Sequence, residues 1–194
     1  MLDLLLKHCH LPNGRTQVDV GVQAGRIVAI QEALDAPAHQ VVDCGGQLLT
    51  SPFVDAHFHM DSTLTYGQPR VNQSGTLLEG ITLWGELKPH LHQEAIIERA
   101  LQYCDWAVAR GLLAIRSHVD ISDDRLLAVE ALLQVKKQVA PYLDLQLVAF
   151  PQDGILRSPT ALINLKRALD MGVDVVGGIP HFERTMQQGA ESVQ

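Results

Sequence analysis

The stretch FVDAHFHMD, residues 53–61, joins an apolar strand start to two histidines two positions apart. Side chains at positions i and i+2 of a strand point to the same face, so His57 and His59 can reach one metal ion at the strand's carboxyl end. This pair alone is weak evidence, because solvated or packed histidines are common at such spacing. Asp61 follows as a carboxylate that could orient a ligand imidazole. We therefore interpret His57 and His59 as candidate metal ligands and Asp61 as their partner.

Outward from this stretch the chain alternates strands and helices. Alternating βα units predict a parallel sheet with right-handed crossovers. The segment 62–89 departs from this rhythm, and we interpret its polar, glycine-rich course as a long loop of the kind that covers an active site. Strands are expected at residues 53–59, 112–119, 143–150 and 173–176, and helices at 93–110, from Ser122 to Pro141, and from Ser158 to Gly172.

Residues 1–50 have a different pattern of short strands and turns. Strands are expected at residues 2–7, 17–22, 26–30 and 40–43, with a glycine-containing hairpin turn at 23–25. No polar cluster converges in this part, so we interpret it as a small β unit without chemistry of its own. The predicted domains are therefore 1–50 and 51–194.

Polar residues recur where the later strands end. His118 and Asp120 end the second strand, Gln152 follows the third, and His181 follows the fourth. Parallel barrels place their sites at this end of the strands, which favours a metal site here. Simpler interpretations remain open: His118 could bond a backbone carbonyl, Gln152 could cap a loop, and Asp120 could be a loop carboxylate near a helix N-terminus.

Composition limits the class of protein. The 194 residues carry a formal net charge of −7 without clusters of Lys and Arg, which argues against a nucleic-acid binder. The first residues do not form a signal peptide, and no apolar run approaches the roughly 20 residues of a membrane span. Three widely spaced cysteines argue against a disulfide framework. We expect a soluble, cytoplasmic protein that binds a small molecule and neither nucleic acid nor membrane.

The run VDAHFHMD, residues 54–61, resembles the first-strand metal motif of the amidohydrolase superfamily. Five further blocks, in order, are similar to bacterial cytosine deaminases within it: GQP at 67–69, NQSGTLLEG at 72–80, HVD at 118–120, FPQDG at 150–154 and GIPHFE at 178–183. The resemblance implies an α/β fold, the first half of a (β/α)₈ TIM-type barrel preceded by a small N-terminal β-sandwich portion. Residues 1–50 would form the sandwich portion, and 51–194 would form barrel strands 1 to 4 only, since a whole barrel takes about 250 residues.

Carried over residue by residue, the resemblance implies a divalent metal, Zn or Fe, held by His57 and His59. Gln152 would hydrogen-bond the amide edge of a pyrimidine, a task that suits a side chain with both a donor and an acceptor. The backbone of Leu77 would contact the same ring. Asp61, His118 and His181 match positions near the site and receive no chemical step.

The reaction that the resemblance implies is hydrolytic deamination of a free base, cytosine to uracil plus ammonia, by a metal-bound hydroxide. The remaining ligands and the acid/base residues are expected beyond Gln194, so the isolated chain is expected to be inactive. The full-length protein is expected to be a homo-oligomer. The alternatives are a deaminase of isocytosine or of a triazine-type aminoheterocycle, a cyclic-amide hydrolase, and an inactive half-barrel that serves as a binding or assembly module.

Overall fold

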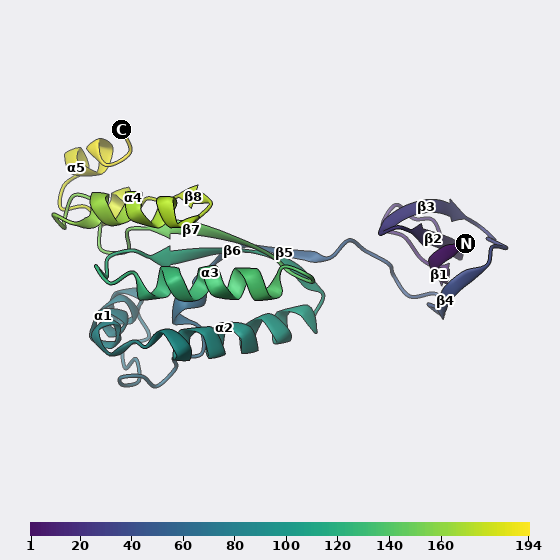
Figure 1. Ribbon diagram of the computed structural model, residues 1–194, viewed down its shortest axis with the longest axis horizontal. Helices are drawn as coiled ribbons and strands as arrows, with labels where there is room; N and C mark the ends of the chain where they lie inside the picture. The colour runs from purple at the N-terminus through teal and green to yellow at the C-terminus, as the bar shows by residue number, and fades with distance from the viewer. The chain divides into compact units, whose positions relative to one another are not determined.

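The computed structural model describes residues 1–194, which form two compact units, Met1–Ser51 and Pro52–Gln194 (Figure 1). The first unit is one four-stranded sheet with the order β3-β2-β1-β4. Its β2–β3 hairpin turns through Ala24 and Gly25, both with positive φ, as two-residue hairpins require. The β-sandwich implied by the resemblance stays a prediction, because these residues form a single sheet. The strands are β1 Leu2–Cys9, β2 Val18–Gln23, β3 Arg26–Gln31 and β4 Ala38–Asp43.

The second unit is a mixed α/β structure whose four strands are all parallel, in the order β5-β6-β7-β8. The expectation of a parallel sheet is therefore confirmed. None of the helices is both long and apolar enough to cross a membrane. The elements are β5 Phe53–Phe58, η1 Met60–Ser62, α1 Leu77–Leu87, η2 Lys88–His90, α2 Gln93–Val108, β6 Leu112–Asp120, α3 Leu127–Val139, β7 Asp144–Phe150, α4 Ala161–Met171, β8 Val175–Val176, η3 Pro180–Phe182 and α5 Met186–Glu191.

The core of this unit lies between the sheet and helices α2 and α3 (Figure 1). Alternate residues of β6, among them Ile115 and Val119, are buried against these helices, as are Leu145 and Leu147 of β7. Because successive strand residues point to opposite faces, the even-numbered residues of β6 and β7 lie on the other face. That parity places His118 on the face opposite the helices.

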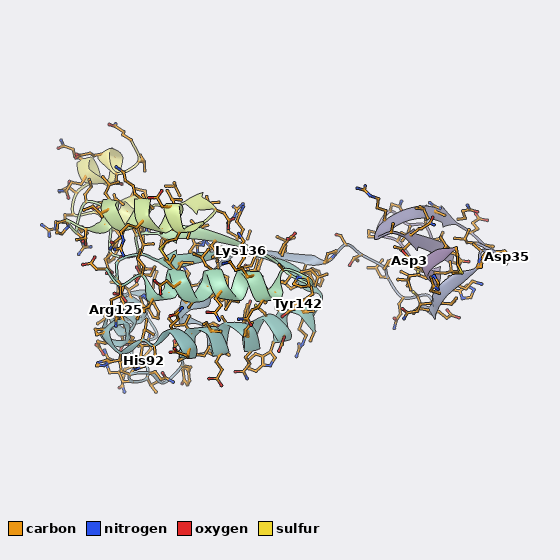
Figure 2. The ribbon with its side chains drawn as sticks, in the orientation of Figure 1. Asp3, Asp35, His92, Arg125, Lys136 and Tyr142 are labelled. Carbon is orange, nitrogen blue, oxygen red and sulfur yellow. The ribbon has the colours of Figure 1, made fainter.

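Every loop that follows a strand lies at one end of this unit. Figure 2 shows His92 and Arg125 where α2 and α3 begin, and Tyr142 at the opposite end of the same helices. In parallel βα units the strand carboxyl ends and the helix N-termini lie at the same end. The loops after β5, β6 and β7 can therefore meet there.

Two helix starts differ from the predictions. Ser122 does not cap α3, because Leu126 occupies the N-cap position and the Ser122 hydroxyl instead accepts a hydrogen bond from the Asp153 amide (3.1 Å). Helix α4 begins at Ala161, and the Ser158 hydroxyl accepts from the Thr160 amide in the turn before it (3.3 Å). In both places a serine hydroxyl bonds elsewhere, which sequence spacing alone does not reveal.

The largest difference lies in residues 62–89, which were predicted to be a loop and contain helix α1. Thr76 is its N-cap and accepts from the amide of Glu79 (3.3 Å), the threonine half of a capping box. The T-x-x-E spacing in the sequence was the signal that could have revealed this helix. The fourth predicted strand is also shorter, only Val175–Val176, and His181 lies in η3 rather than at a strand end.

Candidate functional site

A cleft of about 430 Å³ opens at the carboxyl ends of β5 and β7 in the second unit. Segments far apart in the chain line it, from the end of β5 to η3. His118 does not line the cleft, but its ring centroid is 4.2 Å from that of His57. The fold therefore brings all seven candidate site residues to one place. Six of the seven line the cleft: His57, His59, Asp61, Leu77, Gln152 and His181.

An irregularity in β5 decides which way His57, and His59 just after the strand, point. The register between β5 and β6 shifts between Asp55 and Phe58, and the His57 amide donates to the Asp55 carboxylate (3.1 Å). Phe58 stacks on Tyr103 of α2, with ring centroids 4.2 Å apart, so it faces the helices. A bulge of this kind re-aims side chains next to a site. His57 and His59 consequently lie on the face that bears His118.

The three imidazoles form a compact group. The ring centroid of His59 is 5.3 Å from that of His57 and 5.5 Å from that of His118. Burial, followed by the neighbouring His118 and His57 rings, lowers the pKa of His59 to about 4. Burial and His57 also lower the pKa of His118. These two rings are neutral at pH 7, the form in which imidazole binds a metal.

The residues present fit a divalent metal as part of its ligand set. His57 and His59 offer adjacent imidazole nitrogens, and Nδ1 of His118 is buried without a hydrogen-bond partner. Imidazole suits both Zn and Fe. No group of three or more His, Cys, Asp or Glu side chains within residues 1–194 is placed to hold a metal ion. The imidazoles of His57 and His59 could therefore form part of a ligand set for such a metal.

Asp61 is buried beside the cleft but bonds no imidazole. Its carboxylate accepts from the amides of Asp120 (2.8 Å) and Ser62 (2.9 Å), and burial raises its pKa to about 7. The structure thus departs from the expectation that Asp61 orients a ligand histidine. Its carboxylate joins the end of β5 to the end of β6.

The interpretation of Asp120 as a loop carboxylate is wrong. It is the last residue of β6, only 3% exposed, and accepts from Nε1 of Trp84 (2.7 Å) while pairing with Nζ of Lys88 (2.7 Å). Lys88 also pairs with Asp153 (2.8 Å). Sequence reasoning missed this group because Trp84 and Lys88 become neighbours only once α1 is recognised: Trp84 lies in its last turn, and Lys88, four residues later, is its C-cap.

Leu77 is the first residue of α1, and its amide has no acceptor within the helix. A network before the helix fixes this start. The Glu79 carboxylate accepts from the Ser74 amide and hydroxyl (both 2.6 Å) and from Arg70 (2.7 Å), and Arg70 also pairs with Glu86 (3.0 Å). Because Leu77 lines the cleft, this network determines where one of its walls lies.

The Glu79 network predicts a pH response at the start of α1. Hydrogen bonds from Ser74, and then from Arg70, lower the pKa of Glu79 from 4.5 to about 2. A depressed folded-state pKa stabilises the folded form above about pH 4.5, and this contribution is lost as the pH falls toward 2. We expect the Ser74 amide NMR signal to stay constant from pH 7 down to about pH 3.5. A midpoint near 4.5 would contradict the network, and Glu79→Gln should abolish the titration.

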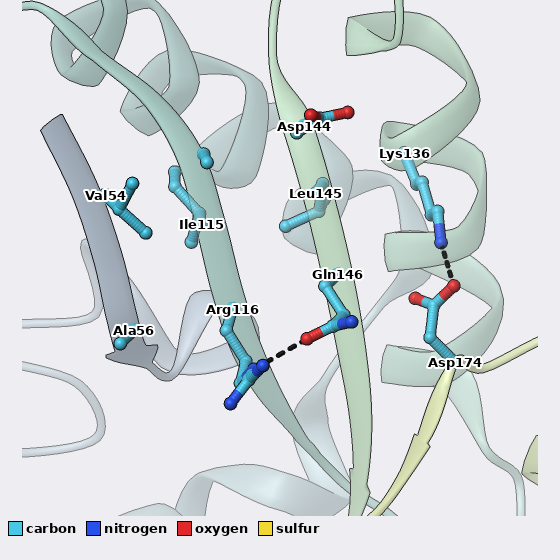
Figure 3. Close-up of a pocket in the computed structure, with 10 residues that line it drawn as sticks. Val54, Ala56, Ile115, Arg116, Lys136, Asp144, Leu145, Gln146 and Asp174 are labelled. Atoms are coloured by element: carbon cyan, nitrogen blue, oxygen red, sulfur yellow. Dashed lines mark hydrogen bonds and ion pairs between the residues drawn. The ribbon is translucent and has the colours of Figure 1, made fainter. Parts of the chain in front are cut away.

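A second cavity of about 430 Å³ lies at the amino ends of the strands (Figure 3). Arg116 donates to Gln146 (2.6 Å), and Lys136 of α3 pairs with Asp174. None of the candidate site residues lines it. These two pairs lie away from the cleft, so they provide matched controls for substitutions there.

Comparison with known proteins decides the family. The model of the amidohydrolase family matches residues 40–193. The chain belongs to the amidohydrolase family. Its sequence is 30% identical, over 91% of the chain, to N-isopropylammelide isopropyl amidohydrolase from Pseudomonas sp. strain ADP. That alignment covers 45% of the relative, so the chain spans about half the length of the curated amidohydrolase that it matches.

Solved structures agree with this assignment. The structure of 5-methylcytosine deaminase from Klebsiella pneumoniae, liganded with phosphonocytosine, matches 97% of the chain with 41% identity and a TM-score of 0.91; the match covers 47% of that protein. N-isopropylammelide isopropylaminohydrolase from Burkholderia multivorans matches 91% of the chain with 25% identity and a TM-score of 0.77, over 45% of its own length. The parallel sheet is consistent with the N-terminal part of the barrel fold of such amidohydrolases.

Proposed function

We propose that this amidohydrolase chain forms part of an enzyme that hydrolytically deaminates a free aminopyrimidine base of the cytosine class, releasing ammonia. The observation that carries the proposal is the convergence of candidate residues from positions 57 to 181 on one cleft, with imidazoles and the Gln152 amide side chain lining it together. The 41% identity to a 5-methylcytosine deaminase supports the choice of substrate class.

The two sides of the cleft suit two tasks. Gln152 offers one donor and one acceptor, which complement the O2 and N1–H atoms on the amide edge of cytosine. The amide of Leu77 provides a further donor at the start of α1. These contacts would hold the ring in the cleft with its amino-bearing carbon toward the imidazoles.

The imidazoles would hold the metal. We propose His57 and His59 as two of its ligands, with the others supplied by residues outside 1–194. A bound divalent cation lowers the pKa of a coordinated water and thereby supplies the nucleophile at neutral pH. His118 and His181 remain residues near the site without a proposed step.

The dimensions of the cleft favour a small substrate. A volume of about 430 Å³ is within the usual range for small-molecule sites, about 300–1,000 Å³. A single heterocyclic base fits such a volume, and we therefore propose a nucleobase as the partner rather than a nucleic acid.

A second candidate is hydrolysis of an alkylamino-triazine. The 30% identity over 91% of the chain to an N-isopropylammelide isopropyl amidohydrolase favours it. A triazine of this kind also has an amide edge with which the Gln152 side chain could form hydrogen bonds. The two candidates differ in the leaving amine, which is ammonia from cytosine and isopropylamine from N-isopropylammelide.

The test is an amine-release assay on the intact, metal-loaded protein that contains this chain. We expect ammonia from cytosine or 5-methylcytosine at a kcat/KM at least about tenfold above that for isopropylamine release from N-isopropylammelide. The reverse preference would establish the triazine alternative. Ring opening of a cyclic amide without release of either amine would exclude both.

A further inference from the structure

Trp84 lies where α1 borders the cleft. Its ring lines the cleft and packs partly against the hydrophobic core of the second unit. Its Nε1–H donates to Oδ2 of Asp120 at 2.7 Å. An indole has only this one donor, at a fixed place on the ring edge, so a single well-anchored acceptor can set the orientation of the whole ring.

Asp120 is such an acceptor, because its carboxylate is itself fixed. It is 3% exposed, its Oδ2 lies 2.7 Å from Nζ of Lys88, and its Oδ1 accepts from the Ser122 amide at 2.7 Å. Its own amide donates to buried Asp61. With both oxygens and the backbone bonded, the Asp120 side chain has no alternative orientation that keeps its partners.

Lys88 joins this acceptor to the opposite wall of the cleft. Its ammonium also pairs with Asp153 at 2.8 Å, and Asp153 follows Gln152 in the chain. Burial acts to lower the pKa of Lys88, but the Asp120 and then Asp153 carboxylates outweigh it and raise the pKa, so the cation persists at pH 7. One mostly buried cation at the C-cap of α1 therefore connects this helix with the loop after β7.

We propose that Trp84 determines specificity as an aromatic wall against which the planar ring of the substrate lies, and that Asp120 and Lys88 are the positioning residues that hold this wall. The inference rests on the proposed function only in taking the substrate to be a flat heterocycle. Aromatic rings prefer offset-stacked or edge-to-face contacts, and a ring held in one orientation loses little freedom on binding.

The test uses the intact, metal-loaded protein labelled with 5-fluorotryptophan and studied by ¹⁹F NMR, with cytosine as the probe. The Trp84 signal is the one missing from Trp84→Phe. We expect cytosine to shift this signal and to leave in place that of Trp106, an exposed residue of α2 outside the cleft lining. In Lys88→Met the ligand-free Trp84 signal should broaden or divide, and KM should rise about tenfold while kcat and metal content change less than about threefold.

The control is Lys136→Met, which removes the ion pair with Asp174 at the other end of the strands and should change neither KM nor the Trp84 signal. A ligand-free Trp84 signal in Lys88→Met identical to that of the unsubstituted protein would overturn the positioning role. Turnover of cytosine without a shift of the Trp84 signal would overturn the aromatic wall. If the protein turns over neither cytosine nor N-isopropylammelide, but the ligand-free Trp84 signal still broadens in Lys88→Met, the positioning role stands and the proposed function fails.

Discussion

Replacing His57 with alanine is expected to remove the metal and the activity together. His57 is one of the two proposed metal ligands, and its ring centroid lies 5.3 Å from that of His59 and 4.2 Å from that of His118. A Lewis-acidic metal contributes several kcal/mol to such a reaction, and each 1.36 kcal/mol is a factor of ten. We expect turnover by the intact protein to fall by at least about 10³-fold.

Metal analysis by mass spectrometry, together with circular dichroism, checks this result. Stoichiometric metal should be lost while the helical signal is kept, because His57 is exposed in the cleft and not part of the core. His92→Ala is the matched control: this exposed histidine precedes α2 and makes no capping hydrogen bond. Full metal content and normal turnover in His57→Ala would show that His57 is not a ligand.

Replacing Gln152 with alanine is expected to separate substrate recognition from metal binding. Gln152 lines the cleft from the loop after β7, whereas His57 and His59 lie at the end of β5 and just after it. Loss of two hydrogen bonds, each about 1.4 kcal/mol, corresponds to about a 10²-fold fall in kcat/KM for the aminopyrimidine. We expect most of this change in KM, with metal content unchanged.

Two further variants sharpen the Gln152 experiment. Gln152→Glu keeps the shape but loses the donor and adds a charge, so it should be no better than alanine at neutral pH. Gln146→Ala is the control: Gln146 lies on β7, the strand before Gln152, and is bonded to Arg116 in the cavity of Figure 3, so its loss should leave kcat/KM unchanged. Unaltered kcat/KM in Gln152→Ala would mean that another residue recognises the amide edge.

Local pattern in the sequence was enough for strands β5 to β8 and for helices α2, α3 and α4 of the second unit. The helix predicted at residues 93–110 is α2, and Ile96, Ala100 and Cys104, spaced four residues apart along it, are buried in the core. The helix end at Gly172 was also predicted, and there the residue adopts the left-handed conformation that glycine allows. Such features depend on neighbours within a few residues, and the sequence displays those neighbours directly.

Other features depend on distant contacts, and the predictions for them were wrong or absent. Ser122 carries a good capping side chain, yet its hydroxyl bonds the Asp153 amide 31 residues away. The T-x-x-E signal for α1 was obscured by the polar and glycine residues around it. The bulge at residues 55–58 is visible only in the pairing of β5 with β6. At Ser122 a tertiary hydrogen bond outweighs local preference, and at β5 the strand register does, whereas the missed signal for α1 was local.

The sequence by itself determined the parallel α/β unit, the HxH pair at a strand end and the order of polar residues after later strands. Periodicity and residue type suffice for these features, because they reflect which side chains are buried and which are exposed to solvent. Only the tertiary structure decided that His57, His59 and His118 share one face and that Asp61 bonds backbone instead of imidazole. It also decided that Lys88 and Asp120 hold Trp84 at the cleft, since those contacts form between strands and helices whose separation in space the sequence does not state.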